Sequence, residues 1–156
     1  MSLYKRILVP IDGSEPAERG LVEAIRLAAR LDARLHVLHV VDANPAVVDA
    51  ARASDREKLL VSMRAVGTEL LGRAQLLASA AGVAADPAMR ETTSQRVADL
   101  VIDEARLAGC DLIVMGTHGR RGISRLAMGS DAEAVVRESA VPVLLVRHPD
   151  AVVAAA

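Results

Sequence analysis

Aromatic side chains are almost missing from this sequence of 156 residues, which contains one tyrosine and neither phenylalanine nor tryptophan. Proteins that bind RNA or single-stranded DNA commonly stack the bases on aromatic side chains. The sequence offers hardly any such surface, which argues against that function. A purine base bound by this protein would have to lie against aliphatic side chains.

The sequence also has only one cysteine, no long apolar run and no excess of basic residues. Cys110 is the single cysteine, which excludes an internal disulfide framework and indicates a reducing compartment. No apolar run reaches the roughly 18 residues of a membrane-spanning helix, and residues 1–6 show no signal-peptide pattern. The 19 Lys and Arg stand against 20 Asp and Glu, for a net charge of -1. We therefore predict a cytoplasmic protein that neither binds nucleic acid nor inserts into a membrane.

Short apolar runs alternate with segments whose apolar residues recur at helical spacing. Strands are predicted at residues 6–11, 35–41, 83–90, 111–115 and 141–146, and helical stripes at 17–31, 54–77, 97–108 and 130–139. Pro87 makes the third strand the weakest of these assignments. Because such alternation favours a parallel sheet covered on both faces, we predict an α/β fold. It is a single-domain, doubly wound five-stranded parallel sheet with strand order 3-2-1-4-5 over residues 1–148, followed by a disordered tail at 149–156.

Two loops at carboxyl ends of predicted strands carry the chemistry, since open parallel sheets bind ligands at that edge. The first is residues 10–14, and the second runs from Met115 through several glycines to Ser130. Glycines let successive N–H groups surround an anion, and the helix predicted to begin at Ser130 adds its dipole. With three arginines in the same stretch, the second loop has the composition of a phosphate site.

Common phosphate motifs do not fit this loop. It contains neither the Gly-Lys-Ser/Thr of a Walker A loop nor the Gly-x-Gly-x-x-Gly of a dinucleotide fold. The Gly-x-x-Gly of KH domains occurs at residues 116–119 and 119–122, but that pattern is weak by itself and here follows a central strand.

The spacing Gly116-x2-Gly119-x9-Gly129-Ser130 resembles the loop of ATP-binding universal stress proteins. The similarity extends to three further segments, 5–14, 110–115 and 141–147, which look like the family's first, fourth and closing strands. The resemblance covers residues 3–148. It implies ATP with Mg²⁺ as the ligand and a homodimer formed through the C-terminal edge strand, Val143 to Val146.

The resemblance also implies a role for each matching position. Asp12 would meet the ribose or a phosphate-bound metal, and the backbone of Val40 and Val41 would read the adenine edge. The phosphates would be held at Gly116, Gly119, Gly129 and Ser130, with His118 and Arg120 nearby; Pro10, Met115 and Val143 complete the set. The chain departs from the family after the third strand, where residues 90–94 lack the usual glycine, so the adenine-side wall is not assigned.

Several of these residues have a simpler structural interpretation. Ser130 and Glu133 match a capping box, a role that is compatible with phosphate binding. Asp12 could only form a turn, and His118 could be a solvated loop residue. His36 and His39 lack neighbours with metal-ligand spacing and are interpreted as structural strand residues, while Cys110 is interpreted as core.

The leading hypothesis is a regulatory ATP-binding protein of the stress response, with an unknown protein partner and no enzymatic role beyond weak, incidental ATP hydrolysis. The loop shows no evident carboxylate base that could orient a water molecule. Two alternatives stay open: a slow ATP-hydrolysing or nucleotidyl-transfer enzyme, and a dimeric interaction module that has lost nucleotide binding. The sequence does not distinguish ATP from ADP or AMP.

Overall fold

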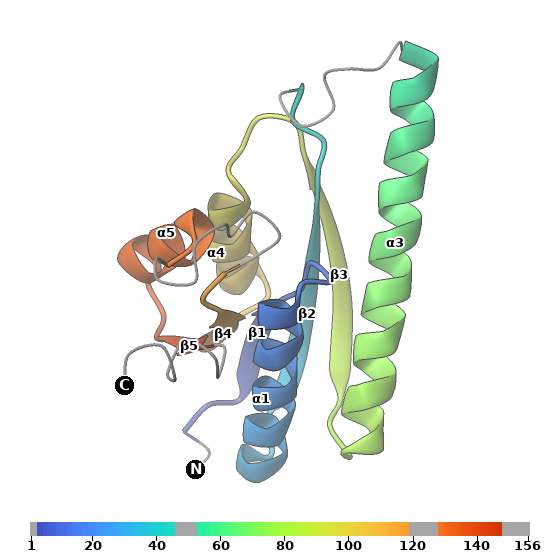
Figure 1. Cartoon of the computed structure of the whole chain (residues 1–156). Coiled ribbons are helices and arrows are strands. Elements are labelled where there is room, and N and C mark those ends of the chain that lie inside the picture. Colours follow the sequence, from blue (N-terminus) through green and yellow to red (C-terminus); the bar gives the residue numbers. More distant parts are fainter. Residues whose placement is uncertain (1–2, 46–52, 119–127, 148–156) are drawn as a thin grey trace, which may run out of the picture.

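The computed structural model describes residues 3–45, 53–118 and 128–147. Strands and helices alternate along these ranges, as Figure 1 shows. In chain order they are β1 (Arg6–Pro10), α1 (Glu15–Leu31), β2 (Arg34–Asp42), α3 (Ala53–Ala80), β3 (Ala85–Thr92), α4 (Val97–Leu107), β4 (Leu112–Gly116), α5 (Ser130–Glu138) and β5 (Val143–Val146). The predicted tail at 149–156 lies outside the described residues.

The strands form one five-stranded sheet in the order β3-β2-β1-β4-β5, and each neighbouring pair is parallel. Ile7 of β1 is opposite Leu35 of β2 on one side and Leu112 of β4 on the other. The predicted fold class and strand order are therefore confirmed. Because all strands run the same way, their carboxyl ends lie along one edge of the sheet.

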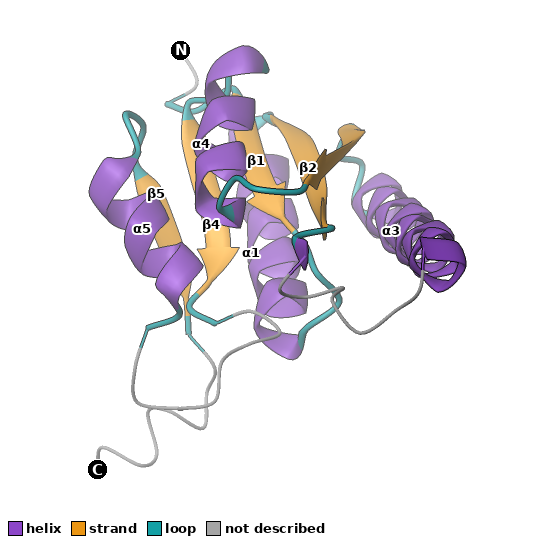
Figure 2. Ribbon diagram, turned by 90° about the horizontal axis from the view of Figure 1, so that it is seen from above, coloured by secondary structure: helices purple, strands orange, loops and turns teal. Residues whose placement is uncertain are grey.

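The side chains of β1 alternate between two hydrophobic clusters, one on each face of the sheet. Ile7 and Val9 pack with α1 and α3, whereas Leu8 packs with α4 and α5. Successive side chains of a strand point to opposite faces, so a strand covered on both sides is apolar throughout. The predicted helices on both faces are present, and Figure 2 shows them on either side of the sheet.

Each of the five strands differs from its predicted range by one or two residues at one end or both, as β3, β5 and β1 illustrate. β3 begins two residues later than predicted and includes Pro87, which an edge strand tolerates. β5 begins at Val143 rather than Val141, since the N–H of Val141 donates to the Ser139 hydroxyl at 3.2 Å in a turn. β1 ends at Pro10, and Ile11 starts the following loop.

A polar group is buried under α4. Glu104, which is 3% exposed, accepts from His36 Nε2 at 2.7 Å and from Arg90 Nε at 2.7 Å. Arg6 lies 3.4 Å from His36 Nδ1, and since a guanidinium only donates, that nitrogen accepts and Nε2 carries the proton. His36 thus joins β2 to α4, as expected of a structural residue.

None of the helices in the described ranges is both long enough and apolar enough to cross a membrane.

Candidate functional site

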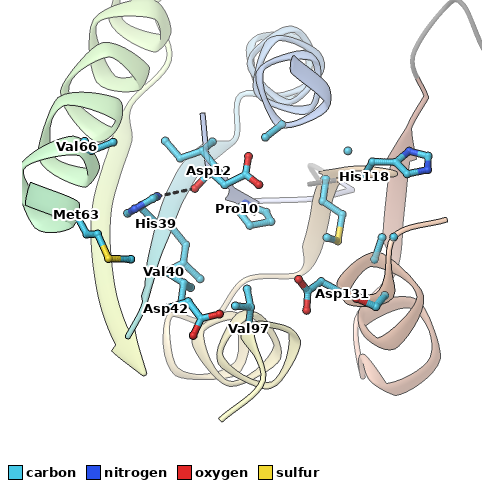
Figure 3. Close-up of a pocket in the computed structure, with 18 of the residues that line it drawn as sticks. Pro10, Asp12, His39, Val40, Asp42, Met63, Val66, Val97, His118 and Asp131 are labelled. Atoms are coloured by element: carbon cyan, nitrogen blue, oxygen red, sulfur yellow. Dashed lines mark hydrogen bonds between the residues drawn. The ribbon is translucent and has the colours of Figure 1, made fainter. Parts of the chain in front are cut away.

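A cavity of about 350 Å³ lies at the carboxyl ends of β1, β2 and β4, and its size falls in the range of small-molecule sites. Figure 3 shows side chains from strands, loops and helices around it. Its lining consists of Pro10, Ile11, Asp12, Ala17, Leu38, His39, Val40, Asp42, Ser62, Met63, Val66, Val97, Met115, Gly116, His118, Gly129, Ser130, Asp131 and Ala132. This is the edge of a parallel sheet at which ligands bind.

The loop after β1 holds Asp12 in a fixed turn. One carboxylate oxygen of Asp12 accepts the N–H of Ser14 at 2.9 Å, and Gly13 between them has a φ of 80°. Ser14 in turn caps α1, because its hydroxyl accepts the N–H of Ala17 at 3.3 Å. Asp12 therefore does form a turn, and it lines the cavity as well.

β2 extends past the end of β1 and exposes backbone toward the cavity. The pairing with β1 ends at Leu38, whose carbonyl accepts the N–H of Ile11 at 2.8 Å, while β2 continues to Asp42 alongside β3. Backbone groups of successive residues in a strand point to alternate sides. Val40 therefore faces the side on which β1 has ended, and Val41 faces β3. Of the two predicted positions, only Val40 lines the cavity.

His39 is a pocket residue that the sequence analysis interpreted as structural only. It is 5% exposed, and its Nδ1 lies 2.9 Å from the carbonyl oxygen of Ile11, the contact drawn in Figure 3. A carbonyl accepts only, so Nδ1 carries the proton. The sequence placed His39 in a strand, but its position beyond the end of β1 depends on the register.

α3 supplies the wall that the sequence analysis left unassigned, through Ser62, Met63 and Val66. Two bonds hold this part of α3 to β3: Arg64 Nε donates to Glu91 at 2.9 Å and its Nη2 donates at 3.1 Å. The hydrogen bond from Arg64 lowers the pKa of the Glu91 carboxyl. Met63 and Val66 belonged to the predicted apolar stripe, yet periodicity does not separate core from pocket wall.

Gly116, at the end of β4, is required by packing. A Cβ at this position would lie 2.5 Å from the carbonyl oxygen of Pro16, in the first turn of α1. A Cβ on Gly20 of α1 would lie 3.1 Å from the backbone nitrogen of Gly116 and 3.3 Å from the carbonyl carbon of Met115. Gly116 and Met115, two of the residues predicted to bind the ligand, line the cavity, but the described contacts explain the glycine without a ligand.

The start of α5 forms the other end of the cavity, where His118, Gly129 and Ser130 line it. The N–H of Gly129 donates to Thr117 at 2.8 Å, and the Thr117 hydroxyl is 3.0 Å from His118 Nδ1. The predicted capping box is wrong: Gly129 is the N-cap and has no side chain that could cap the helix, and Ser130 is the first residue of the helix. Gly119 and Arg120 lie outside the described residues.

Val143 is not brought to the cavity. It is the first residue of β5, opposite Ile113, and packs against the cluster under α4 and α5. Since the cavity lies at the other end of the strands, the predicted role of Val143 in a base pocket has no support in this geometry.

Two further carboxylates line the cavity, Asp42 at the end of β2 and Asp131 in the first turn of α5. An oxygen of Asp42 accepts the N–H of Asn44 at 3.1 Å. Across residues 3–45, 53–118 and 128–147, no three His, Cys, Asp or Glu side chains gather in a way that could hold a metal ion. Any Mg²⁺ here would need ligands from a bound molecule, as is usual for Mg²⁺ with phosphates.

Comparison with known proteins gives a consistent result. The profile of the universal stress protein family matches residues 3–147. A universal stress protein of Methanocaldococcus jannaschii is 34% identical over 148 residues, which is 95% of this chain and 85% of that protein. A crystal structure from the same family in Burkholderia pseudomallei is 34% identical with a TM-score of 0.78, covering 95% and 99% of the two chains. Another solved structure, a universal stress protein in complex with cAMP, is 28% identical with a TM-score of 0.68, covering 94% and 99%.

Proposed function

The chain belongs to the universal stress protein family, and from this we propose that its cavity binds an adenine nucleotide, in the first place ATP with Mg²⁺. In this proposal the protein is a cytoplasmic regulator of the stress response that acts through a protein partner, not through catalysis. The observation that carries it is one cavity with an aliphatic end at α3 and a helix N-terminus at the other end.

The α3 end suits a purine ring. Pro10, Val40, Met63 and Val66 offer aliphatic and thioether surfaces in place of aromatic ones. The N–H and C=O of Val40, directed past the end of β1, present one donor and one acceptor. Adenine offers an acceptor and an amino donor side by side, and guanine presents the reverse order. Either base could pair with these two groups, so the choice of adenine in this proposal rests on the cAMP-bound relative.

The α5 end suits phosphate. Gly129 and Ser130 begin a helix whose first N–H groups and dipole attract anions. The carboxylate of Asp12 can contact the ribose or a metal that the phosphates hold, which agrees with the lack of a protein metal cage among the described residues. Mg²⁺ would supply positive charge to the phosphates there.

A relative supports the ligand class. The 28% identical universal stress protein was solved in complex with cAMP, an adenine nucleotide with a single phosphate. We therefore include cAMP and AMP with ATP and ADP among the ligands to be compared.

The edge strand β5 supports a homodimer. It is the last strand of the sheet, and Leu144 in its centre is 40% exposed. An exposed apolar edge readily pairs with another chain, and we propose that a second copy occupies it.

The test begins with the freshly purified protein, which is denatured so that released nucleotides can be identified by chromatography and mass. Thermal melts with each nucleotide follow. A ligand at 100 times its Kd adds about 2.7 kcal/mol, and a chain of this size should then melt about 5 to 11 °C higher.

Matched variants assign the effect to the cavity. Asp12→Asn keeps the turn to Ser14 and removes the charge, Asp12→Ala removes both, and Asp103→Ala is the control on the exposed side of α4. The proposal is supported if the nucleotide no longer raises Tm in the Asp12 variants but still raises it in Asp103→Ala. Absence of any bound nucleotide and any shift would leave a dimeric interaction module as the function.

The same preparation decides the question of enzymatic activity. Asp42 and Asp131 line the cavity, so carboxylates that could act on a water molecule are present although the loop sequence did not indicate them. We expect ATP hydrolysis far below the roughly 10 s⁻¹ of a typical enzyme. A rate near that value would place the protein among enzymes.

A further inference from the structure

We propose that His39 is a positioning residue of the cavity, which holds the Asp12 loop through the carbonyl of Ile11 and sets the position of α3 through Gly67. The inference rests on the proposed function, because its consequence is nucleotide affinity. Its structural part can be measured without any ligand.

The first contact of His39 fixes the peptide group that precedes Asp12. The Ile11 carbonyl accepts from His39 Nδ1 at 2.9 Å, while the Ile11 N–H donates to Leu38 at 2.8 Å. Both polar groups of Ile11 are therefore bound to β2. Since the Ile11 carbonyl lies in one plane with the N–H and Cα of Asp12, the imidazole also holds the peptide group from which Asp12 extends.

The second contact of His39 is with α3. A Cβ on Gly67 would lie 2.5 Å from His39 Cδ2, 3.1 Å from Nε2 and 2.8 Å from the Met89 methyl group. The ring thus occupies the space directly against the helix backbone. Glycine is unfavourable inside a helix, and this close approach accounts for it at position 67.

The two contacts join opposite walls of the cavity. Met63 lies one turn before Gly67 and Val66 directly before it, and both line the cavity together with Asp12 and His39. Figure 3 shows His39 between the α3 side chains and the Asp12 loop. An apolar residue of similar size could fill the same volume, but it could not donate to Ile11. The donor is what separates positioning from packing.

Three variants test the loop contact. His39→Leu removes the donor, whereas His39→Asn keeps an N–H near the place of Nδ1. Loss of one such bond corresponds to about tenfold in affinity, so we expect His39→Leu to bind Mg-ATP about tenfold more weakly and His39→Asn to recover most of the loss. If His39 acts through Asp12, the effects of the two substitutions are not additive. In an Asp12→Ala background, His39→Leu should therefore change the affinity for Mg-ATP by less than about threefold. Equal losses in both backgrounds, or no rescue by asparagine, would overturn the positioning role.

The α3 contact has its own pair of variants. Gly67→Ala should weaken Mg-ATP binding by displacing the ring, whose Cδ2 lies 2.5 Å from the added Cβ. In a His39→Ala background, where the ring is absent, Gly67→Ala should cause little further loss of affinity. Gly72→Ala, on the same helix with nothing within 4 Å of its added Cβ, should bind like the unmodified protein. If Gly67→Ala binds equally well, the α3 part of the inference is wrong.

Hydrogen exchange separates the failure of this inference from the failure of the proposed function. Without ligand, a peptide spanning Ile11 to Ser14 should exchange faster in His39→Leu than in the unmodified protein, while peptides from α4 are unchanged. Faster exchange in a protein that binds no nucleotide would keep the positioning role and reject the nucleotide. Unchanged exchange together with normal Mg-ATP binding in His39→Leu would reject the role of His39 and keep the nucleotide.

Discussion

Gly116→Ala is expected to destabilise the protein in the absence of any ligand. The added Cβ would lie 2.5 Å from the Pro16 carbonyl oxygen and 2.6 Å from its carbon. Both are backbone atoms in the first turn of α1, so relief requires a shift of the helix against β4. Overpacking of this kind costs about 1 to 3 kcal/mol, and the rigid neighbour places the expected loss near the upper value, about 3 kcal/mol. For a chain of this length, that lowers Tm by about 6 to 12 °C.

The assay is thermal and urea unfolding of the nucleotide-free protein, with Gly72→Ala as the matched control. A Cβ on Gly72 meets nothing within 4 Å, and alanine at this helix position should raise the free energy of unfolding by about 0.5 to 1 kcal/mol. The two glycine-to-alanine changes are thus predicted to have opposite signs. If Gly116→Ala melts like the unmodified protein and loses only nucleotide affinity, the glycine serves the ligand and the packing argument is refuted.

Four further outcomes are expected. Glu104→Leu leaves the buried proton on His36 Nε2 without its acceptor. It should lower the free energy of unfolding by about 3 kcal/mol, the lower end for a broken buried pair, because Arg90 is half-exposed. Urea unfolding against the unmodified protein measures this, and a decrease below about 0.5 kcal/mol would contradict it. Burial raises the pKa of Cys110 to about 11, so a thiol reagent at pH 8 should react about 200-fold faster in urea than with the native protein. Because the unfolded chain loses that proton first, near pH 8.5, Cys110 should also make the folded state less stable as pH rises from about 8.5 to 11, and Cys110→Ala should remove that part of the pH dependence. Leu144→Glu, on the edge strand β5, should shift the protein to a monomer in sedimentation, and an unchanged mass would remove β5 as the dimer interface.

Much of the site was predictable because it follows from positions within single segments. Pro10 ends a strand and Asp12 follows it, Met115 and Gly116 end another strand, and Gly129 and Ser130 begin a helix. Each was therefore recognisable from local pattern and from the family spacing. The structure places all of these residues, with Val40 and His118, around one cavity.

The errors and omissions concern distances between segments. The capping box at Ser130 was wrong by one residue, since the helix takes Gly129 as its N-cap. Val143 was placed in the base pocket, although its register with Ile113 puts it at the far end of the strands. His39 and the α3 wall were missed, because an apolar stripe or a strand histidine looks the same whether it meets core or cavity.

The sequence by itself determined the alternation of strands and helices, the parallel sheet and the edge at which the loops gather, because hydrophobic periodicity and turn residues act over a few neighbouring positions. Only the tertiary structure decided that β2 runs past β1 to direct Val40 into the cavity, that Gly116 is a contact with Pro16, and that His39 touches both Ile11 and Gly67. These depend on strand register and on helix-to-sheet distance. Both the register and this distance are set by the packing of side chains that are far apart in the chain. A local sequence pattern does not predict such packing.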